Sequence, residues 1–162
     1  MSLGNEMNTV VDDHEIAIAP MRRTFERMRE GFQDEMIPTL AARIDRLDRL
    51  ARMTRRHAQE IIDAISADFG NRSAHETLVA DLLAVDEAIK HARRHLPNWM
   101  RPKDVPTGLK YRPGYNRLIP QPLGVVGVLA PWNYPYQLSI LPAVAALAAG
   151  NRVMIKPSEV TP

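Results

Sequence analysis

The stretch GVVGVLAPWNYP at residues 124–135 decides the fold class of this chain. It opens with a continuous apolar run, which is typical of a strand buried on both faces of a parallel sheet, and it closes with a polar turn bounded by prolines. An apolar, alanine-rich segment at residues 139–149 predicts a helix, in which Pro142 is tolerated if it lies in the first turn and otherwise causes a kink. Another apolar segment at residues 153–155 predicts a second strand. Together these segments predict one β-α-β unit with a right-handed crossover.

A single β-α-β unit does not complete a parallel sheet. A buried parallel strand needs neighbours on both edges and helices on both faces, and two strands alone leave ladder groups and apolar faces uncovered. The second predicted strand ends seven residues before Pro162. We therefore expect the 162 residues to be the front part of a longer α/β protein, with a function that needs further residues.

Composition divides the chain near residue 96. Residues 1–96 hold 17 of the 19 acidic residues and 2 of the 13 prolines, whereas residues 97–162 hold 11 prolines. Proline interrupts helices and cannot donate to a sheet ladder. We therefore expect long helices in the front part and short strands, turns and extended segments in the back part.

Three helices are predicted in the front part. The first covers residues 13–29, and the second runs from Pro38 to residue 69 with a bend at residues 54–57. The third begins at a capping box formed by Ser73 and Glu76, and Pro97 ends it. Behind them, residues 98–107 are predicted to be an extended connection. Short strands are predicted at residues 110–112 and 115–119, on either side of a Pro-Gly turn.

Composition also excludes several kinds of site and partner. The chain has no cysteine, so it holds no disulfide, thiolate metal site or cysteine nucleophile. A net charge of +2 gives no reason to expect a nucleic-acid partner. The absence of a long apolar run predicts no membrane span, and we expect a cytoplasmic protein. His91 and His95 have cationic neighbours that favour a solvated helix face, so we expect no metal site.

Polar side chains follow both predicted strands at their carboxyl ends, where open α/β sheets bind ligands. Asn133 offers an amide that can stabilise a developing oxyanion. Lys156 and Glu159 offer a donor and an acceptor for a ribose diol. Taken alone, each cluster also fits an ordinary turn or a solvated loop. The glycines at 124 and 127 precede or lie inside the strand, so they do not form the usual dinucleotide-binding fingerprint.

Several motifs, with their spacing, resemble the aldehyde dehydrogenase superfamily over residues 122–162. They are PWNYP at 131–135, ALAAGN at 146–151 and KPSE at 156–159, and AISADFG at 64–70 extends the likeness to the front part. Within the superfamily, NRSAHET at 71–77 and WMRP at 99–102 are most similar to coniferyl aldehyde dehydrogenases, near the class 3 enzymes.

The resemblance implies NAD(P)+-dependent oxidation of an aldehyde, such as aromatic coniferyl aldehyde, to its acid through a cysteine thioester. It implies that Asn133 holds the oxyanion and that Lys156 and Glu159 contact the adenosine ribose. Because a carboxylate repels a 2′-phosphate, Glu159 favours NAD+, with NADP+ as a possible cofactor. The resemblance also places Asn133 among the cofactor-binding residues, together with Ser158 and the crevice residues Leu129, Ala130, Pro131 and Trp132.

The resemblance also implies an organisation and a partner. Residues 1–106 would be helices of the NAD-binding domain, residues 107–122 strands of an oligomerisation flap, and residues 123–162 the first β-α-β unit of a Rossmann-like sheet. The flap implies a homodimer. The nucleophilic cysteine and the general base would come after residue 162, so this piece alone is expected to be inactive. The alternative that the sequence leaves open is a non-catalytic helical interaction module with an appended β segment.

Overall fold

The computed structural model describes residues 4–162, with side chains from residue 18 onward. Its α-helices are α1 (Gly4–Gln33), α2 (Leu40–Arg56), α3 (Ala58–Asp68), α4 (Ala74–Glu76), α5 (Ala84–Trp99) and α6 (Pro135–Ala148). A π-helical turn, η1 (Thr77–Leu83), joins α4 to α5, and η2 (Leu109–Tyr111) is a short 3₁₀ helix. The strands are β1 (Lys103–Val105), β2 (Asn116–Leu118), β3 (Val125–Leu129) and β4 (Arg152–Lys156).

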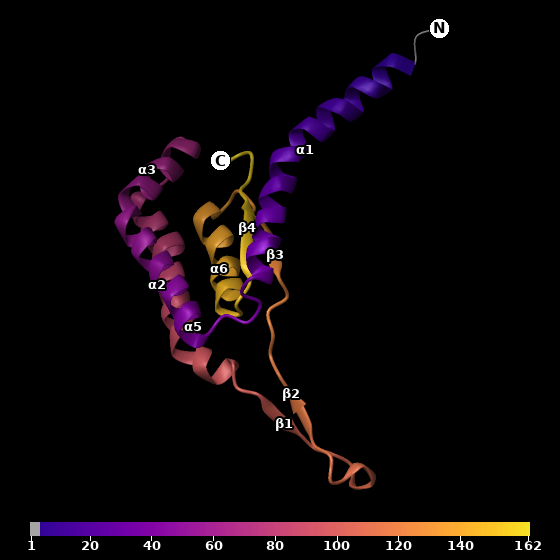
Figure 1. Ribbon diagram of the computed structural model, residues 1–162. Coiled ribbons are helices and arrows are strands. Elements are labelled where there is room, and N and C mark those ends of the chain that lie inside the picture. The colour runs from indigo at the N-terminus through magenta and orange to yellow at the C-terminus, as the bar shows by residue number, and fades with distance from the viewer. Residues whose placement is uncertain (1–3) are drawn as a thin grey trace.

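The predicted β-α-β unit is confirmed. Strands β3 and β4 pair in parallel, from Val125 opposite Arg152 to Leu129 opposite Lys156, and α6 connects them. Helices α1 and α6 pack on opposite faces of the two strands, and α2 and α5 form a further layer against α6 (Figure 1). The structure thus has the α/β architecture expected from the sequence.

The core lies between α2, α5 and α6. Leu47, Ile89, Leu96 and Val144 are its large buried side chains, each drawn from the apolar face of an amphipathic or apolar helix. At one end of this interface the Thr54 and Tyr136 hydroxyl groups lie 2.6 Å apart and hydrogen bond. No helix in the part of the chain that the structure describes is both long and apolar enough to cross a membrane.

Buried polar side chains fix where the β-α-β unit begins and turns. The Arg43 guanidinium on α2 donates to the carbonyl oxygens of Pro38, at 3.0 Å, and Ala148, at 3.2 Å. It therefore satisfies a carbonyl at the C-terminal end of α6, which has no partner inside the helix. The Asn151 Oδ1 accepts from the backbone N–H groups of Leu123 and Gly124, which ties the start of β3 to the start of β4.

Helix boundaries differ from the sequence predictions at several places. The bend predicted at residues 54–57 is confirmed, because His57 separates α2 from α3. However, α1 begins at Gly4 rather than residue 13, since residues 5–19 contain neither glycine nor proline to stop it. Helix α2 begins at Leu40, where the Thr39 hydroxyl accepts from the backbone N–H of Ala42 and acts as the cap.

The third predicted helix is wrong in its cap and in its end. Ser73 stands at the cap position but makes no side-chain cap hydrogen bond, and the Glu76 carboxylate pairs with Arg72, at 3.3 Å, so no capping box forms. Pro97 does not stop α5, which runs to Trp99. A proline in the last turn removes only one late hydrogen bond, so the helix continues past it.

Three further predictions for the back part are corrected. Residues 110–112 are not a strand, because the backbone N–H of Gly114 bonds to the Tyr111 carbonyl at 2.9 Å and closes a tight turn there. The strand near residues 115–119 is confirmed as β2, but its partner is β1, in the segment expected to be an extended connection. Helix α6 begins at Pro135, so Pro142 lies in its interior rather than in its first turn.

Candidate functional site

The turn between β3 and α6 carries the candidate oxyanion donor. The end of β3 is joined to the end of β4 by the backbone N–H of Ala130, which donates to the Lys156 carbonyl at 3.0 Å. Leu129, opposite Lys156 in register, is 81% exposed, so β3 is not buried on both faces at this end. Pro135 occupies the first turn of α6, where its missing N–H costs nothing. Asn133, between these elements, is exposed to solvent.

A buried arginine from the front part of the chain holds this turn. Arg72 lies in the loop between α3 and α4, is 5% exposed at its side chain, and donates from Nη1 to the Asn133 carbonyl oxygen at 2.7 Å. Its guanidinium carbon lies 4.8 Å from the centre of the Phe69 ring and 4.6 Å from that of Tyr134. Such cation–π contacts are strongest when desolvated, as they are here. Arg72 therefore clamps the turn that presents the Asn133 side chain.

An aspartate from η1 completes the support. Asp81 is fully buried, and its Oδ1 accepts from the backbone N–H of Gln137, in the first turn of α6, at 2.8 Å. Its Oδ2 lies 3.5 Å from Nη2 of Arg72. Burial raises the pKa of Asp81, while the Gln137 N–H and the Arg72 charge act in the opposite direction. Asp81 thus joins the N-terminus of α6 to the arginine that holds the turn.

The second polar cluster follows β4. The Lys156 ammonium donates to the Glu159 carboxylate and, at 3.2 Å, to the Pro157 carbonyl oxygen, and both charged groups remain exposed to solvent. The hydrogen bond from Lys156 holds the pKa of Glu159 below its usual value. The Ser158 hydroxyl accepts from the backbone N–H of Val160 at 3.2 Å, which shapes the loop. The loop therefore presents an ammonium donor and an ionised carboxylate acceptor side by side.

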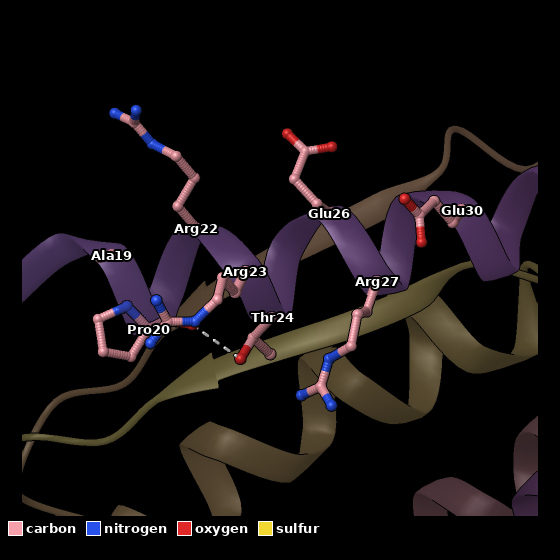
Figure 2. Close-up of a pocket in the computed structure, with 8 residues that line it drawn as sticks. All are labelled: Ala19, Pro20, Arg22, Arg23, Thr24, Glu26, Arg27 and Glu30. Carbon is pink, nitrogen blue, oxygen red and sulfur yellow. Dashed lines mark hydrogen bonds between the residues drawn. The ribbon is translucent and has the colours of Figure 1, made fainter.

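Two of the hollows that the described residues line lie along α1. One of about 620 Å³ lies between α1 and the sheet, and Leu129 and Lys156 are among its lining residues. The other is lined by residues of α1 alone, most of them charged (Figure 2). There Arg22 and Glu26 point away from the sheet, and the Thr24 hydroxyl donates to the Pro20 carbonyl. Only the first hollow adjoins residues that the sequence predicted for a site.

The structure places the site residues predicted from the sequence near the carboxyl ends of β3 and β4. Lys156 is joined to Ala130 by a hydrogen bond and to Glu159 by an ion pair, while Pro131, Trp132 and Asn133 form the adjoining turn. The Trp132 ring is half-exposed and lies 6.1 Å, centre to centre, from that of Phe69.

Sequence reasoning missed the supporting residues. In the sequence, Phe69, Arg72 and Asp81 are only parts of predicted helices or of a family likeness, because their common role depends on contacts with residues about sixty positions away. The one local signal for this role is an arginine at position 72, between Phe69 and the start of the third predicted helix. That pattern does not by itself predict a buried side chain.

The arrangement offers groups that fit a dinucleotide and a carbonyl substrate. The exposed Lys156 and Glu159 pair provides the donor and acceptor that a ribose diol requires. The exposed amide of Asn133 provides a neutral donor for oxygen that becomes negatively charged. Both lie at the carboxyl ends of parallel strands, where doubly wound sheets bind ligands.

Comparisons with known proteins show which family the chain is similar to. The aldehyde dehydrogenase family model matches residues 8–162. The chain is 42% identical over 145 residues to a probable coniferyl aldehyde dehydrogenase of Pseudomonas aeruginosa. The matched region covers 90% of this chain and 30% of that protein. The chain therefore spans about three tenths of the length of this curated relative.

Solved structures are similar in fold. The substrate-bound AldH of Staphylococcus aureus matches with a TM-score of 0.82 and 31% identity over 88% of this chain and 31% of that one. An NAD-dependent benzaldehyde dehydrogenase of Corynebacterium glutamicum matches with a TM-score of 0.75 and 28% identity over 89% of this chain and 30% of that one. The likeness read from the PWNYP, ALAAGN and KPSE motifs is thus confirmed, and the chain belongs to the aldehyde dehydrogenase family.

Proposed function

We propose that this chain is the N-terminal part of an NAD+-dependent aldehyde dehydrogenase that oxidises an aromatic aldehyde to the corresponding acid. The observation that carries the proposal is the placement of Asn133 and of the Lys156–Glu159 pair after two paired parallel strands. Support for the aromatic substrate comes from the coniferyl aldehyde dehydrogenase relative and from the structural neighbour that acts on benzaldehyde.

Each residue has a defined part in this proposal. The Asn133 amide donates to the aldehyde oxygen as negative charge develops on it, which lowers the energy of the tetrahedral state. Lys156 and Glu159 hold the adenosine ribose, with Ser158 beside them, and Leu129 to Trp132 line the crevice. When bound, the nicotinamide supplies a hydride acceptor. The attacking thiolate comes from another part of the protein, because these 162 residues contain no cysteine.

The complete protein that contains this chain tests the proposal. We expect reduced nicotinamide to accumulate, seen by its absorbance, only when both NAD+ and an aldehyde are present, and the acid to form in equal amount. Coniferyl aldehyde and benzaldehyde should give higher kcat/KM than a short aliphatic aldehyde. If no aldehyde supports reduction of NAD+ or NADP+, the non-catalytic alternative replaces the proposal.

Replacing Glu159 with glutamine should weaken the preference for NAD+. The neutral side chain no longer repels the 2′-phosphate of NADP+, so the ratio of kcat/KM values for NAD+ and NADP+ should fall about tenfold. Because Lys156 lowers the pKa of Glu159, the wild-type preference should persist through neutral pH and decline only in acid, as the carboxylate is protonated. Steady-state kinetics with both cofactors measures the ratio; Glu60→Gln, on the exposed surface of α3, is the control. An unchanged ratio would remove the ribose role of Glu159.

The β1–β2 hairpin supports a homodimer as part of the proposal. It extends from the body of the molecule (Figure 1) and carries exposed apolar and aromatic side chains, namely Leu109, Tyr111, Tyr115, Leu118 and Ile119. Apolar groups of this kind, on an edge strand, favour pairing with another chain. Light scattering on the complete protein should give the mass of a dimer, and Leu118→Asp should shift it toward the monomer. A monomeric wild type would rule out the dimer.

A further inference from the structure

Arg72 combines a hydrogen bond, two cation–π contacts and two ion pairs beside the turn that holds Asn133. One guanidinium donates to the Asn133 carbonyl oxygen, stacks against Phe69 and Tyr134, and faces the carboxylates of Glu76 and Asp81. The side chain is 5% exposed. A buried charge is costly unless it is paired and hydrogen-bonded, so each of these contacts bears on whether the arginine stays in place.

The contacts connect three separate elements. Phe69 ends α3, Asp81 belongs to η1, and Tyr134 and Asn133 precede α6. Asp81 also accepts from the Gln137 N–H, one of the amide groups that the first turn of a helix leaves without an internal partner. Arg72 and Asp81 thus fix both the backbone of the turn and the start of the helix that follows it.

The point of attachment is the Asn133 backbone rather than its side chain. Nη1 of Arg72 bonds to the Asn133 carbonyl oxygen at 2.7 Å, while the side-chain amide stays exposed. A hydrogen bond from a charged donor holds a backbone group more firmly than a neutral one does. The direction in which the amide points therefore depends on a residue that does not itself reach the ligand.

We propose that Arg72, held by Asp81 and by the rings of Phe69 and Tyr134, is a positioning residue that aims the Asn133 amide at the reacting carbonyl oxygen. This inference rests on the proposed function. Displacing a catalytic donor by about 1 Å can cost up to about 10²-fold in rate. Arg72 therefore acts on kcat through Asn133 and leaves cofactor binding at the Lys156–Glu159 pair unaffected.

The test uses the complete protein with Arg72→Met and Arg72→Lys. Methionine keeps an apolar stem and removes the charge and the donor; lysine keeps the charge and one donor direction. We expect Arg72→Met to lower kcat about tenfold or more, with a much smaller change in the Kd for NAD+, and Arg72→Lys to recover part of the loss. Arg55→Met is the matched control, because Arg55 pairs with Asp86, at 2.6 Å, on an exposed surface away from the turn.

A double-mutant cycle separates positioning from general stabilisation. If Arg72 acts through Asn133, then Arg72→Met in an Asn133→Ala background should lower kcat little further. An unchanged kcat in an active enzyme, or a loss that multiplies with that of Asn133→Ala, would overturn the inference and leave the proposed function standing. If Arg72→Met does not fold, the same cycle with Arg72→Lys decides. A wild type without aldehyde oxidation overturns the proposed function and this inference with it.

Discussion

Asn133→Ala is expected to lower kcat for aldehyde oxidation about 10²–10³-fold in the complete protein, as the loss of one oxyanion donor does in other enzymes. The alanine side chain cannot donate a hydrogen bond to the developing oxyanion. Because that interaction strengthens only as charge builds on the oxygen, its loss raises the barrier more than it weakens ground-state binding. The Kd for NAD+ should change little, since Lys156 and Glu159 follow the other strand.

The measurement pairs steady-state kinetics with calorimetric titration of NAD+. Asn98→Ala is the matched control, because Asn98 is also exposed but lies near the end of α5. The control should keep the wild-type kcat. If Asn133→Ala also keeps it, the Asn133 amide does not stabilise the transition state, and the turn serves only to connect β3 to α6.

The β-α-β unit could be predicted because its signals are local. The apolar run of β3, the alanine-rich α6 and the apolar residues of β4 each identify an element from neighbouring residues. Glycine at 150 marks the end of α6 by the same kind of signal. Because parallel strands end on the same side of a sheet, predicting the two strands also predicted that the polar residues after them lie near one another.

The parts that the sequence did not predict depend on contacts between distant residues. Strand β1 forms because residues 103–105 meet residues 116–118 across the loop of residues 106–115, and no periodicity in either segment selects that partner. Likewise, Arg72 is buried because two rings and Asp81 enclose it. Tertiary context of this kind overrides the tendency of a charged loop residue to face water.

The candidate site shows the same division. Lys156 and Glu159 are three residues apart, so a short loop brings them together, and their pairing could be expected from the motif. In contrast, Arg72 and Asn133 are 61 residues apart, and their hydrogen bond could not be predicted from the sequence. The candidate groups that follow each strand could thus be predicted from the sequence, and the structure was needed to identify what holds them.

The second large effect is expected at Gly150, where α6 ends and β4 begins. Gly150 has φ +92°, a conformation that costs other residues about 1–3 kcal/mol. A Cβ added there would also lie 2.7 Å from Cζ of Arg43 and 2.9 Å from Cγ of Pro122. Gly150→Ala therefore strains the backbone and also displaces the guanidinium that bonds to the Ala148 carbonyl.

Gly70→Ala separates these two costs. Gly70 has a similar φ of +78°, but among the described residues no heavy atom lies within 4 Å of the position its Cβ would take. Gly70→Ala should therefore lower the free energy of unfolding by the backbone contribution alone, about 1–2 kcal/mol. Gly150→Ala should lower it by about 3 kcal/mol or more, because the displaced Arg43 leaves buried polar groups without partners. Urea unfolding of the complete protein, followed by far-ultraviolet circular dichroism, gives both free energies. Equal losses for the two variants would mean that Arg43 moves without cost and does not clamp the turn between α6 and β4.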